Sequence, residues 1–328
     1  MAMTWRLLAI PSMPQFLKIA ASLTLFRNIM RKRHFIAAIA TCLVLAGTGL
    51  GYSFIGVSPS ACKVIDRQPA ALAPILLKSS PGAAPLTVTR IAHATVLIDF
   101  DGVRVLTDPW FTEKTHFHQG EPLGIALKDL PRLDLIVATH AHDDHFDLHA
   151  MAEYPHKDVP FLVGPDMVKA ARAAGFTQVR ELAAWEAWEH GPFKVTGIPA
   201  RHKIPELTFM IEAKGRTVYF GGDTLLIPEL RQLPERFPVI DLALLSVNGL
   251  TVFGEPVVMS AEEAGELAGV LKARVAIPMH YRFVGSWFTD TFVLGRNGTP
   301  ERFVSAAKRL APDTEVRVLE PGQPQVIR

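Results

Sequence analysis

Residues 133–147 read LDLIVATHAHDDHFD, a short apolar run that passes directly into polar residues. The run itself, residues 135–138, contains β-branched side chains and has the pattern of a buried strand. Four residues that can bind a metal follow it within six positions: His140, His142, Asp144 and His145. Neutral imidazoles and carboxylates suit zinc and its first-row neighbours. One histidine after a strand is usually a surface or hydrogen-bonded residue, whereas this grouping predicts a metal site.

The spacing of these residues predicts how they divide between ions. Alternate residues at a strand end point the same way, so His140 and His142 can converge on one ion. Asp144 and His145 lie past the end of the strand and are free to turn toward a second ion.

Metal-binding residue types also follow three later strand-like runs: His202, Asp223 and His280. Taken singly, they have ordinary explanations as a loop residue, a turn former and a hydrogen-bonded core histidine. An α/β architecture gathers strand ends at one edge of a sheet. As a set beside the first cluster, the three residues therefore favour a single site.

Composition limits the class of protein. The 328 residues are 49% hydrophobic and 20% charged, which is enough for one large globular domain. The net charge of +2 gives no sign of nucleic-acid binding. The only cysteines, Cys42 and Cys62, precede the globular part, so a thiolate site or disulfide framework in the catalytic region is excluded.

The N-terminal region contains a candidate membrane segment. Basic residues 31–34 precede residues 35–57, which carry no charged side chain and are long enough to span ~30 Å of hydrocarbon as a helix. This run is either an uncleaved signal-anchor or an export signal peptide. The basic residues predict a catalytic domain on the extracytoplasmic side of a bacterial-type inner membrane, or an exported one.

The remaining boundaries follow from composition. Residues 1–29 form an odd semi-apolar lead, so Met30 is a candidate start, with an interfacial segment as the alternative. Residues 30–57 are the signal peptide or anchor, and residues 58–85 are an Ala/Pro-rich tether. Residues 86–328 are expected to form one catalytic domain.

Within that domain, strand-like and helix-like runs point to an α/β (α+β) fold with sheets covered by helices. Strands are expected at residues 87–91, 95–100, 103–107, 133–139, 193–199, 217–221, 241–247 and 274–278. Helices are expected at residues 166–174, 260–271 and 300–310. Ser260 and Glu263 form a capping-box pattern, and Thr299 with Pro300 marks another helix start.

The motif order His-x-His-x-Asp-His, a later His, Gly-Gly-Asp-Thr and a final His resembles the metallo-β-lactamase-fold hydrolases. The resemblance runs from residue 86 to at least 281. It is nearest the branch of N-acyl-phosphatidylethanolamine phospholipase D and the ascorbate-6-phosphate lactonase type. The segments that carry it are residues 91–95, 106–109, 185–186, 199–202 and 277–281. Lys203 and Ala92 differ from the Trp and Gly usual in the phospholipase-type enzymes.

The resemblance implies a four-layer αββα sandwich and two metal ions, expected to be zinc, with manganese or iron as alternatives. It implies that His140, His142 and His202 hold the first ion. Asp144, His145 and His280 would hold the second, with Asp223 bridging both. Two ions ~3.5–4 Å apart can share a water whose pKa falls toward ~7. The resulting bridging hydroxide would attack an ester-type bond, either a phosphodiester (including a lipid-derived one) or a lactone.

Several further residues are candidates around the metals. Asp108 and Asp143 could accept hydrogen bonds from metal-bound histidines, or serve in a turn or cap. Asp144 and His93 are the catalytic candidates; for His93, pocket lining or proton donation competes with a hydrogen-bonded structural role. Four aromatic residues either wall a substrate cleft or, as is favoured, pack in the core: Trp110, Phe111, Trp287 and Phe288.

The expected function is therefore a metal-dependent hydrolase, a phosphodiesterase or lactonase, acting on a small-molecule or lipid-derived substrate and contacting the membrane through residues 35–57. One rival is an iron-binding redox protein of the same fold, but no flavodoxin-like partner domain is present. Another is a non-catalytic binding or regulatory module, which would not need all seven ligand positions. The sequence does not indicate an oligomeric state.

Overall fold

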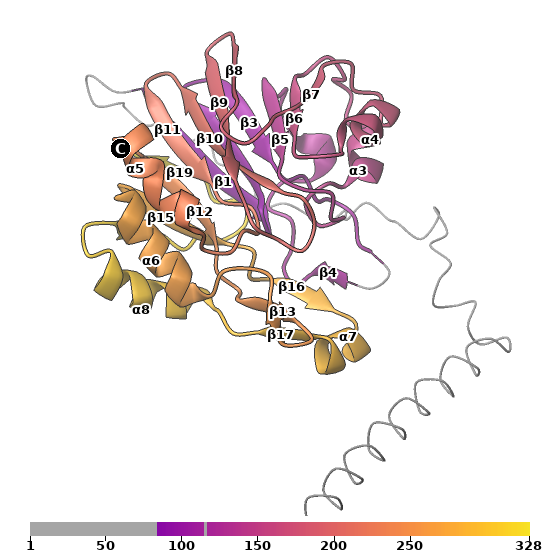
Figure 1. The fold of residues 1–328 in the computed structure, drawn as a ribbon. Coiled ribbons are helices and arrows are strands. Elements are labelled where there is room, and N and C mark those ends of the chain that lie inside the picture. The colour runs from indigo at the N-terminus through magenta and orange to yellow at the C-terminus, as the bar shows by residue number, and fades with distance from the viewer. Residues whose placement is uncertain (1–83, 115–116) are drawn as a thin grey trace, which may run out of the picture. The chain divides into compact units, whose positions relative to one another are not determined.

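The computed structural model describes residues 84–114 and 117–328. The predicted lead, membrane segment and nearly all of the tether lie outside these residues. Two seven-stranded sheets form the centre (Figure 1). The first sheet contains, in spatial order, β19 (Gln325–Ile327), β1 (Leu86–Ala92), β2 (Thr95–Phe100), β3 (Val103–Thr107), β5 (Leu135–Ala138), β6 (Phe161–Val163) and β7 (Val179–Glu181).

The second sheet repeats the plan of the first. It contains, in spatial order, β18 (Glu315–Val316), β15 (Val275–Met279), β12 (Leu242–Ser246), β11 (Arg216–Phe220), β10 (Leu207–Ala213), β9 (Phe193–Pro199) and β8 (Ala187–His190). In both sheets an antiparallel meander continues into parallel strands: β1–β2–β3 leads to β5, and β9–β10–β11 leads to β12. Strands of both sheets therefore deliver their carboxyl ends to the same edge of the sandwich.

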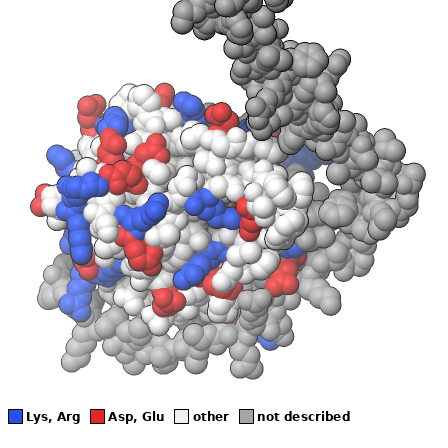
Figure 2. All heavy atoms as spheres, turned by 90° about the horizontal axis from the view of Figure 1, so that it is seen from below, with Lys and Arg blue, Asp and Glu red and all other residues white. Residues whose placement is uncertain are grey.

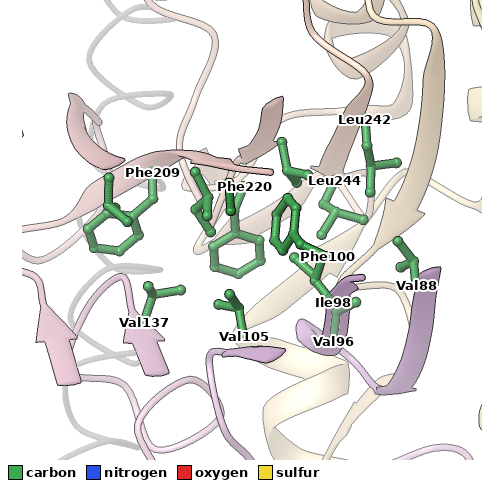
Figure 3. Packing of buried hydrophobic residues seen from close by; sticks show 14 of the residues in the cluster. Val88, Val96, Ile98, Phe100, Val105, Val137, Phe209, Phe220, Leu242 and Leu244 are labelled. Atoms are coloured by element: carbon green, nitrogen blue, oxygen red, sulfur yellow. The ribbon is translucent and has the colours of Figure 1, made fainter. Parts of the chain in front are cut away.

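The inner faces of the two sheets form the main core. Alternate residues of β2, such as Val96 and Ile98, point inward because side chains along a strand alternate between its faces. Figure 3 shows these residues and Val105 facing Phe209 and Phe220 of the opposite sheet. This buried apolar surface holds the sheets together and fixes the register of the strands that carry the site.

Helices cover the outer faces and complete four layers. On the first sheet, α3 (Leu148–Glu153) and α4 (Val168–Ala173) bury residues such as Met151 and Ala171. On the second sheet, η4 (Pro228–Gln232), α5 (Leu233–Arg236), α6 (Ala261–Leu271) and α8 (Pro300–Leu310) take this role (Figure 1). The molecule has the mixed α/β arrangement that the sequence predicts.

Smaller elements lie beside the sandwich. A short turn, η3 (Leu127–Asp129), lies on the first sheet's side. One two-stranded sheet joins β4 (Phe117–Gln119) to β16 (Phe283–Gly285). A three-stranded sheet contains β14 (Glu255–Pro256), β13 (Leu250–Val252) and β17 (Leu294–Arg296), and α7 (Trp287–Phe292) precedes β17. Across residues 84–114 and 117–328, no helix has the length and apolarity needed to cross a membrane.

The structure confirms several elements that local sequence signals predicted. The capping box of α6 is present: Ser260 Oγ accepts a hydrogen bond from Glu263 N, and the Glu263 carboxylate accepts one from Ser260 N. Thr299 caps α8, and Gly175 adopts a φ of +98° just after α4. The predicted helix at 166–174 begins two residues late because Met167, and not Asp166, occupies the N-cap position.

Several elements have no predicted counterpart. β10 is an example: six of its seven residues are buried, so it has no apolar–polar alternation to read. The predicted strand at 133–139 is shortened to β5, because the chain bends at Asp134 and His140 and Thr139 N donates to the Asp108 side chain instead of to a strand.

Candidate metal centre

Three histidines meet at the shared edge of the two sheets. His140 and His142 follow β5 of the first sheet, and His202 follows β9 of the second. His142 Nδ1 lies 2.9 Å from His140 Nε2 and 3.2 Å from His202 Nε2. One ligand nitrogen from each ring can be chosen so that all lie within 4.8 Å of one another. Three imidazoles from two sheets thus face a single point.

A second group lies next to the first. It comprises His93, Asp144, His145 and His280, whose ligand atoms also lie within 4.8 Å of one another. Asp223, which follows β11, places Oδ2 2.9 Å from His280 Nε2 and 3.3 Å from His145 Nε2. The rings of His140 and His145 have centroids 4.3 Å apart, so the two groups adjoin. The structure thereby brings all seven candidate ligands to one place.

Hydrogen bonds determine which ring nitrogen faces the centre. His145 Nδ1 lies 2.6 Å from Asp108 Oδ2, and His202 Nδ1 lies 2.8 Å from the carbonyl oxygen of Val257. Each contact engages Nδ1 as donor and leaves Nε2 for a metal, as is usual for metal-bound histidines. Asp108 also accepts hydrogen bonds from Thr139. Asp143, the other candidate for this role, is exposed to solvent instead.

Unpartnered nitrogens test whether the site fits a metal. Within the described residues, His145 Nε2 and both ring nitrogens of His93 and His280 are buried and have no hydrogen-bond partner. Buried polar atoms rarely lack a partner in native proteins, because leaving one unpaired costs about 1–3 kcal/mol. A cation bound by one nitrogen of each ring and by the adjacent carboxylates would satisfy three of these five atoms, so the donor set fits a metal.

The charges of the site also suit a metal. Burial, reinforced by neighbouring imidazoles, lowers the pKa of His140 to about 3 and that of His142 to about 4, so both rings are neutral and able to bind metal. Burial alone would raise the pKa of Asp144, but adjacent histidines hold it well below its usual range. Burial opposes charge on His145, yet the surrounding carboxylates raise its pKa well above its usual value. Neutral imidazoles at His140 and His142 and an ionised carboxylate at Asp144 are the forms in which these side chains bind a metal.

His93 belongs to this cluster although it precedes the motif by almost fifty residues. Its Nε2 lies 3.3 Å from Asp144 Oδ2, and its ring centroid is 3.9 Å from that of His280. Burial, with His280 second, lowers the pKa of His93 to about 3. Apart from the 3.3 Å approach of Nε2 to Asp144, neither ring nitrogen of His93 has a polar partner within the described residues, so the ring lies among the candidate ligands.

Glu206 was not predicted and lies beneath the site. Its side chain is fully buried, with Oε1 3.3 Å from His140 Nδ1 and accepting a 2.6 Å hydrogen bond from Asp223 N. Burial raises the pKa of Glu206 to about 7. The sequence feature that could have indicated Glu206 is its position: it is an acidic residue four positions after His202 and directly ahead of the buried strand β10.

The aromatic candidates separate into two pairs. Trp110 and Phe111 are fully buried, which agrees with core packing, and Trp110 contacts His93 edge-to-face at 5.0 Å. The prediction of core packing is wrong for Trp287 and Phe288, which are 76% and 59% exposed. They lie on α7, where Thr289 and Asp290 are the partly buried residues. Lys203 is also exposed, next to His202.

Two facing sheets covered by helices, with histidines and aspartates gathered at one edge, define a metal-dependent hydrolase of the metallo-β-lactamase fold. Residues 103–281 match the family model for the Beta-lactamase superfamily domain. A UPF0173 metal-dependent hydrolase from Anaeromyxobacter sp. (strain K) is 31% identical over 259 residues, covering 72% of this chain and 85% of its own. Another, from Methanopyrus kandleri, is 28% identical and covers 73% and 98%.

The chain belongs to the UPF0173 family of metal-dependent hydrolases. Among solved structures, Igni18, a metallo hydrolase from Ignicoccus hospitalis, superposes with a TM-score of 0.58 at 24% identity, over 74% of this chain and 99% of that one. This likeness concerns the fold.

Proposed function

We propose that the protein is a binuclear hydrolase of ester-type bonds. His140, His142 and His202 would hold one ion, and Asp144, His145 and His280 the other, with Asp223 between them. The observation that carries this proposal is the pair of adjoining ligand groups, each drawn from both sheets. Zinc is the expected ion, and the nitrogen and oxygen donors also suit manganese or iron.

The chain's own residues prepare the site for hydrolysis. When bound, such ions lower the pKa of water and polarise the bond under attack. Asp144 stays ionised and lies 3.3 Å from His93 Nε2, so this carboxylate partly offsets the burial that lowers the pKa of His93 to about 3. We propose His93 as the group that passes a proton to the leaving group across this contact. Asp108 and the carbonyl of Val257 hold the ligand imidazoles in the productive tautomer.

The proposed substrate is a phosphodiester, including a lipid-derived one, or a lactone. The resemblance of residues 91–95 and 277–281 to the phospholipase and lactonase branch supports this choice. We further propose that residues 35–57 place the chain at a membrane, with the catalytic domain on the extracytoplasmic side. The uncharged run and the basic residues before it support that location.

The experiment is metal analysis of the purified full chain together with a parallel screen of phosphodiester, lactone and β-lactam substrates. His142→Ala should lose activity and bind less metal, because it removes the imidazole shared by both short contacts of the first group. The matched control is His149→Ala, which alters an exposed histidine on α3. Full activity and full metal content in His142→Ala would contradict the proposal.

A further inference from the structure

Helix α7 has an inverted distribution of polar and apolar side chains. Trp287, Phe288 and Phe292 are 76%, 59% and 58% exposed. Asp290, in contrast, turns toward the protein, where it accepts hydrogen bonds from Gly285 N at 3.1 Å and from Arg296 at 2.7 Å. A surface helix normally buries its apolar side and exposes its polar one. The apolar side of α7 therefore lacks a partner within the described residues.

A neighbouring turn enlarges this surface. Phe253, between β13 and β14, is 75% exposed and has a φ of +51°, which is unusual for a residue with a bulky side chain. Its backbone N–H bonds to the carbonyl of Val293 at the end of α7, over 2.7 Å. Seven large hydrophobic residues are exposed in the described chain, and four of them form what we call the aromatic face: Phe253, Trp287, Phe288 and Phe292.

The aromatic face is connected to the metal centre. β16 links His280 to α7, and the ring of its Phe283 lies 6.0 Å from His93 and 5.1 Å from Phe117. Figure 2 views the molecule from the side on which α7, β13 and β17 lie in Figure 1, and shows a broad uncharged area beside charged side chains. The aromatic face is therefore joined to His93 and His280 through β16.

We propose that the aromatic face docks on a lipid bilayer. Trp and Phe are the side chains that settle at the boundary of headgroups and acyl chains, and burying them there removes apolar surface from water. Contiguous exposed apolar surface of this kind marks an interaction site. The occupant follows from the same chain, because residues 35–57 form an uncharged run of membrane-spanning length.

Tether length supports this choice. Residues 58–85 can extend at most about 100 Å, at ~3.3–3.6 Å per residue, so a membrane-held chain keeps its domain within reach of the bilayer. Such tethering raises the effective concentration of the surface that the face would contact. The inference goes beyond the proposed hydrolysis and rests on the proposed membrane segment.

The test uses the full chain reconstituted in phosphatidylcholine vesicles, without substrate. Tryptophan fluorescence is quenched by phosphatidylcholine brominated near the headgroup or, separately, by aqueous iodide. Trp287→Phe should lose the component quenched by brominated lipid, because Trp287 sits in the bilayer. The matched control is Trp188→Phe on β8, the edge strand of the second sheet, which should keep that component. Vesicle flotation of Trp287→Phe separately reports whether residues 35–57 hold the chain to the membrane once the aromatic face is weakened.

Each alternative gives a distinct result. A floating protein whose Trp287 is reached by iodide but not by brominated lipid has a free aromatic face, which overturns the proposal. If neither quencher reaches Trp287, a protein partner or a second copy covers the face, which also overturns it. Because no turnover is measured, a wrong substrate class or an inactive site leaves the outcome unchanged.

Discussion

At the residue scale, the site is built on unusual backbone geometry. His93, Asp108 and His280 all have positive φ, at +53°, +32° and +60°. Such conformations cost about 1–3 kcal/mol for residues other than glycine and persist where surrounding contacts impose them. The contacts are present here: His280 N donates to the carbonyl of His93, and Thr139 donates twice to Asp108. Three of the nine described non-glycine residues with positive φ therefore lie at the candidate metal centre, where these contacts hold them.

Glu206 yields a prediction on pH and stability. Its folded pKa of about 7 exceeds the ordinary value of 4.5, so between these pH values the native protein holds a proton that the unfolded chain releases. Metal-free protein should therefore lose stability as pH rises from about 4.5 to 7, by up to about 3 kcal/mol. Glu206→Gln cannot ionise, so chelated Glu206→Gln should unfold at a higher temperature than chelated wild type at pH 8, but not at pH 4.

The control for that comparison is Glu212→Gln. Glu212 lies on β10, the strand that follows Glu206, with a side chain 33% exposed and an ion pair to Lys194 at 3.8 Å. Its replacement makes the same carboxyl-to-amide change at a partly exposed position, so it should not reproduce the effect of Glu206→Gln. Parallel pH profiles for wild type and Glu206→Gln, measured by thermal unfolding, would show that burial does not perturb Glu206.

At the element scale, α6 and α8 pack at unusually short range. A Cβ added at Gly265 would lie 2.8 Å from Ala306 Cβ, and one added at Gly269 would lie 2.2 Å from the carbonyl oxygen of Leu310. Glycine is normally unfavourable inside a helix, by about 0.8–1.0 kcal/mol relative to alanine. Here it permits the close approach that seals the outer face of the second sheet.

Gly269→Ala should accordingly destabilise the protein, although helix propensity alone predicts the opposite. The clashing atom is the backbone carbonyl oxygen of Leu310, which can move only if the backbone of the chain shifts. We therefore expect a net loss of about 1–3 kcal/mol in the free energy of unfolding. Urea denaturation measures this change. Glu262→Ala, at an exposed position of the same helix, should change stability by less than about 0.5 kcal/mol. A more stable Gly269→Ala would refute the packing argument.

At the scale of the whole molecule, a buried ion pair ties distant segments together. Arg90 on β1 pairs with Glu121, donates Nε to the carbonyl of Leu319 at 2.9 Å, and lies 5.0 Å from the ring of Tyr281. Glu121 also accepts a hydrogen bond from His93 N. The pair therefore joins the first strand, the C-terminal region and the backbone of the metal site.

Arg90→Met should be strongly destabilising, by about 3–5 kcal/mol, because it leaves the buried Glu121 carboxylate without its guanidinium. The double variant Arg90→Met with Glu121→Leu should recover much of that loss, since neither charge then remains buried. Chemical denaturation of the two variants and wild type tests this. Equal stability of the single and double variants would mean that the pair is not coupled.

Metal should also stabilise the whole fold. A ligand that binds only the native state contributes about 4 kcal/mol when present at a thousand times its Kd. Removal of metal by a chelator should therefore lower the unfolding temperature, and adding zinc back should restore it. His280→Ala should show a smaller shift because one ligand of the second group is missing. An unchanged unfolding temperature after verified metal removal would contradict a metal bound across both sheets.

A sequence pattern predicts an element well when all the residues that form the pattern lie within one short segment. The hairpin at Asp101 and Gly102, the capping box of α6 and the apolar run of β5 each depend on neighbours within a few residues, and each was predictable. β10 and α7 were not. The first is buried on both faces, and the second exposes aromatic side chains that composition alone assigns to a core.

The sequence by itself determined that several strands end in metal-binding residue types, because strand alternation and strand ends are local properties. Only the tertiary structure decided that His93 joins the second group, that Glu206 bonds to Asp223 N, and which ring nitrogens of His145 and His202 face the centre. Those outcomes depend on contacts between segments far apart in the chain. Such contacts form when two sheets bury their inner faces, and residue spacing contains no record of that packing.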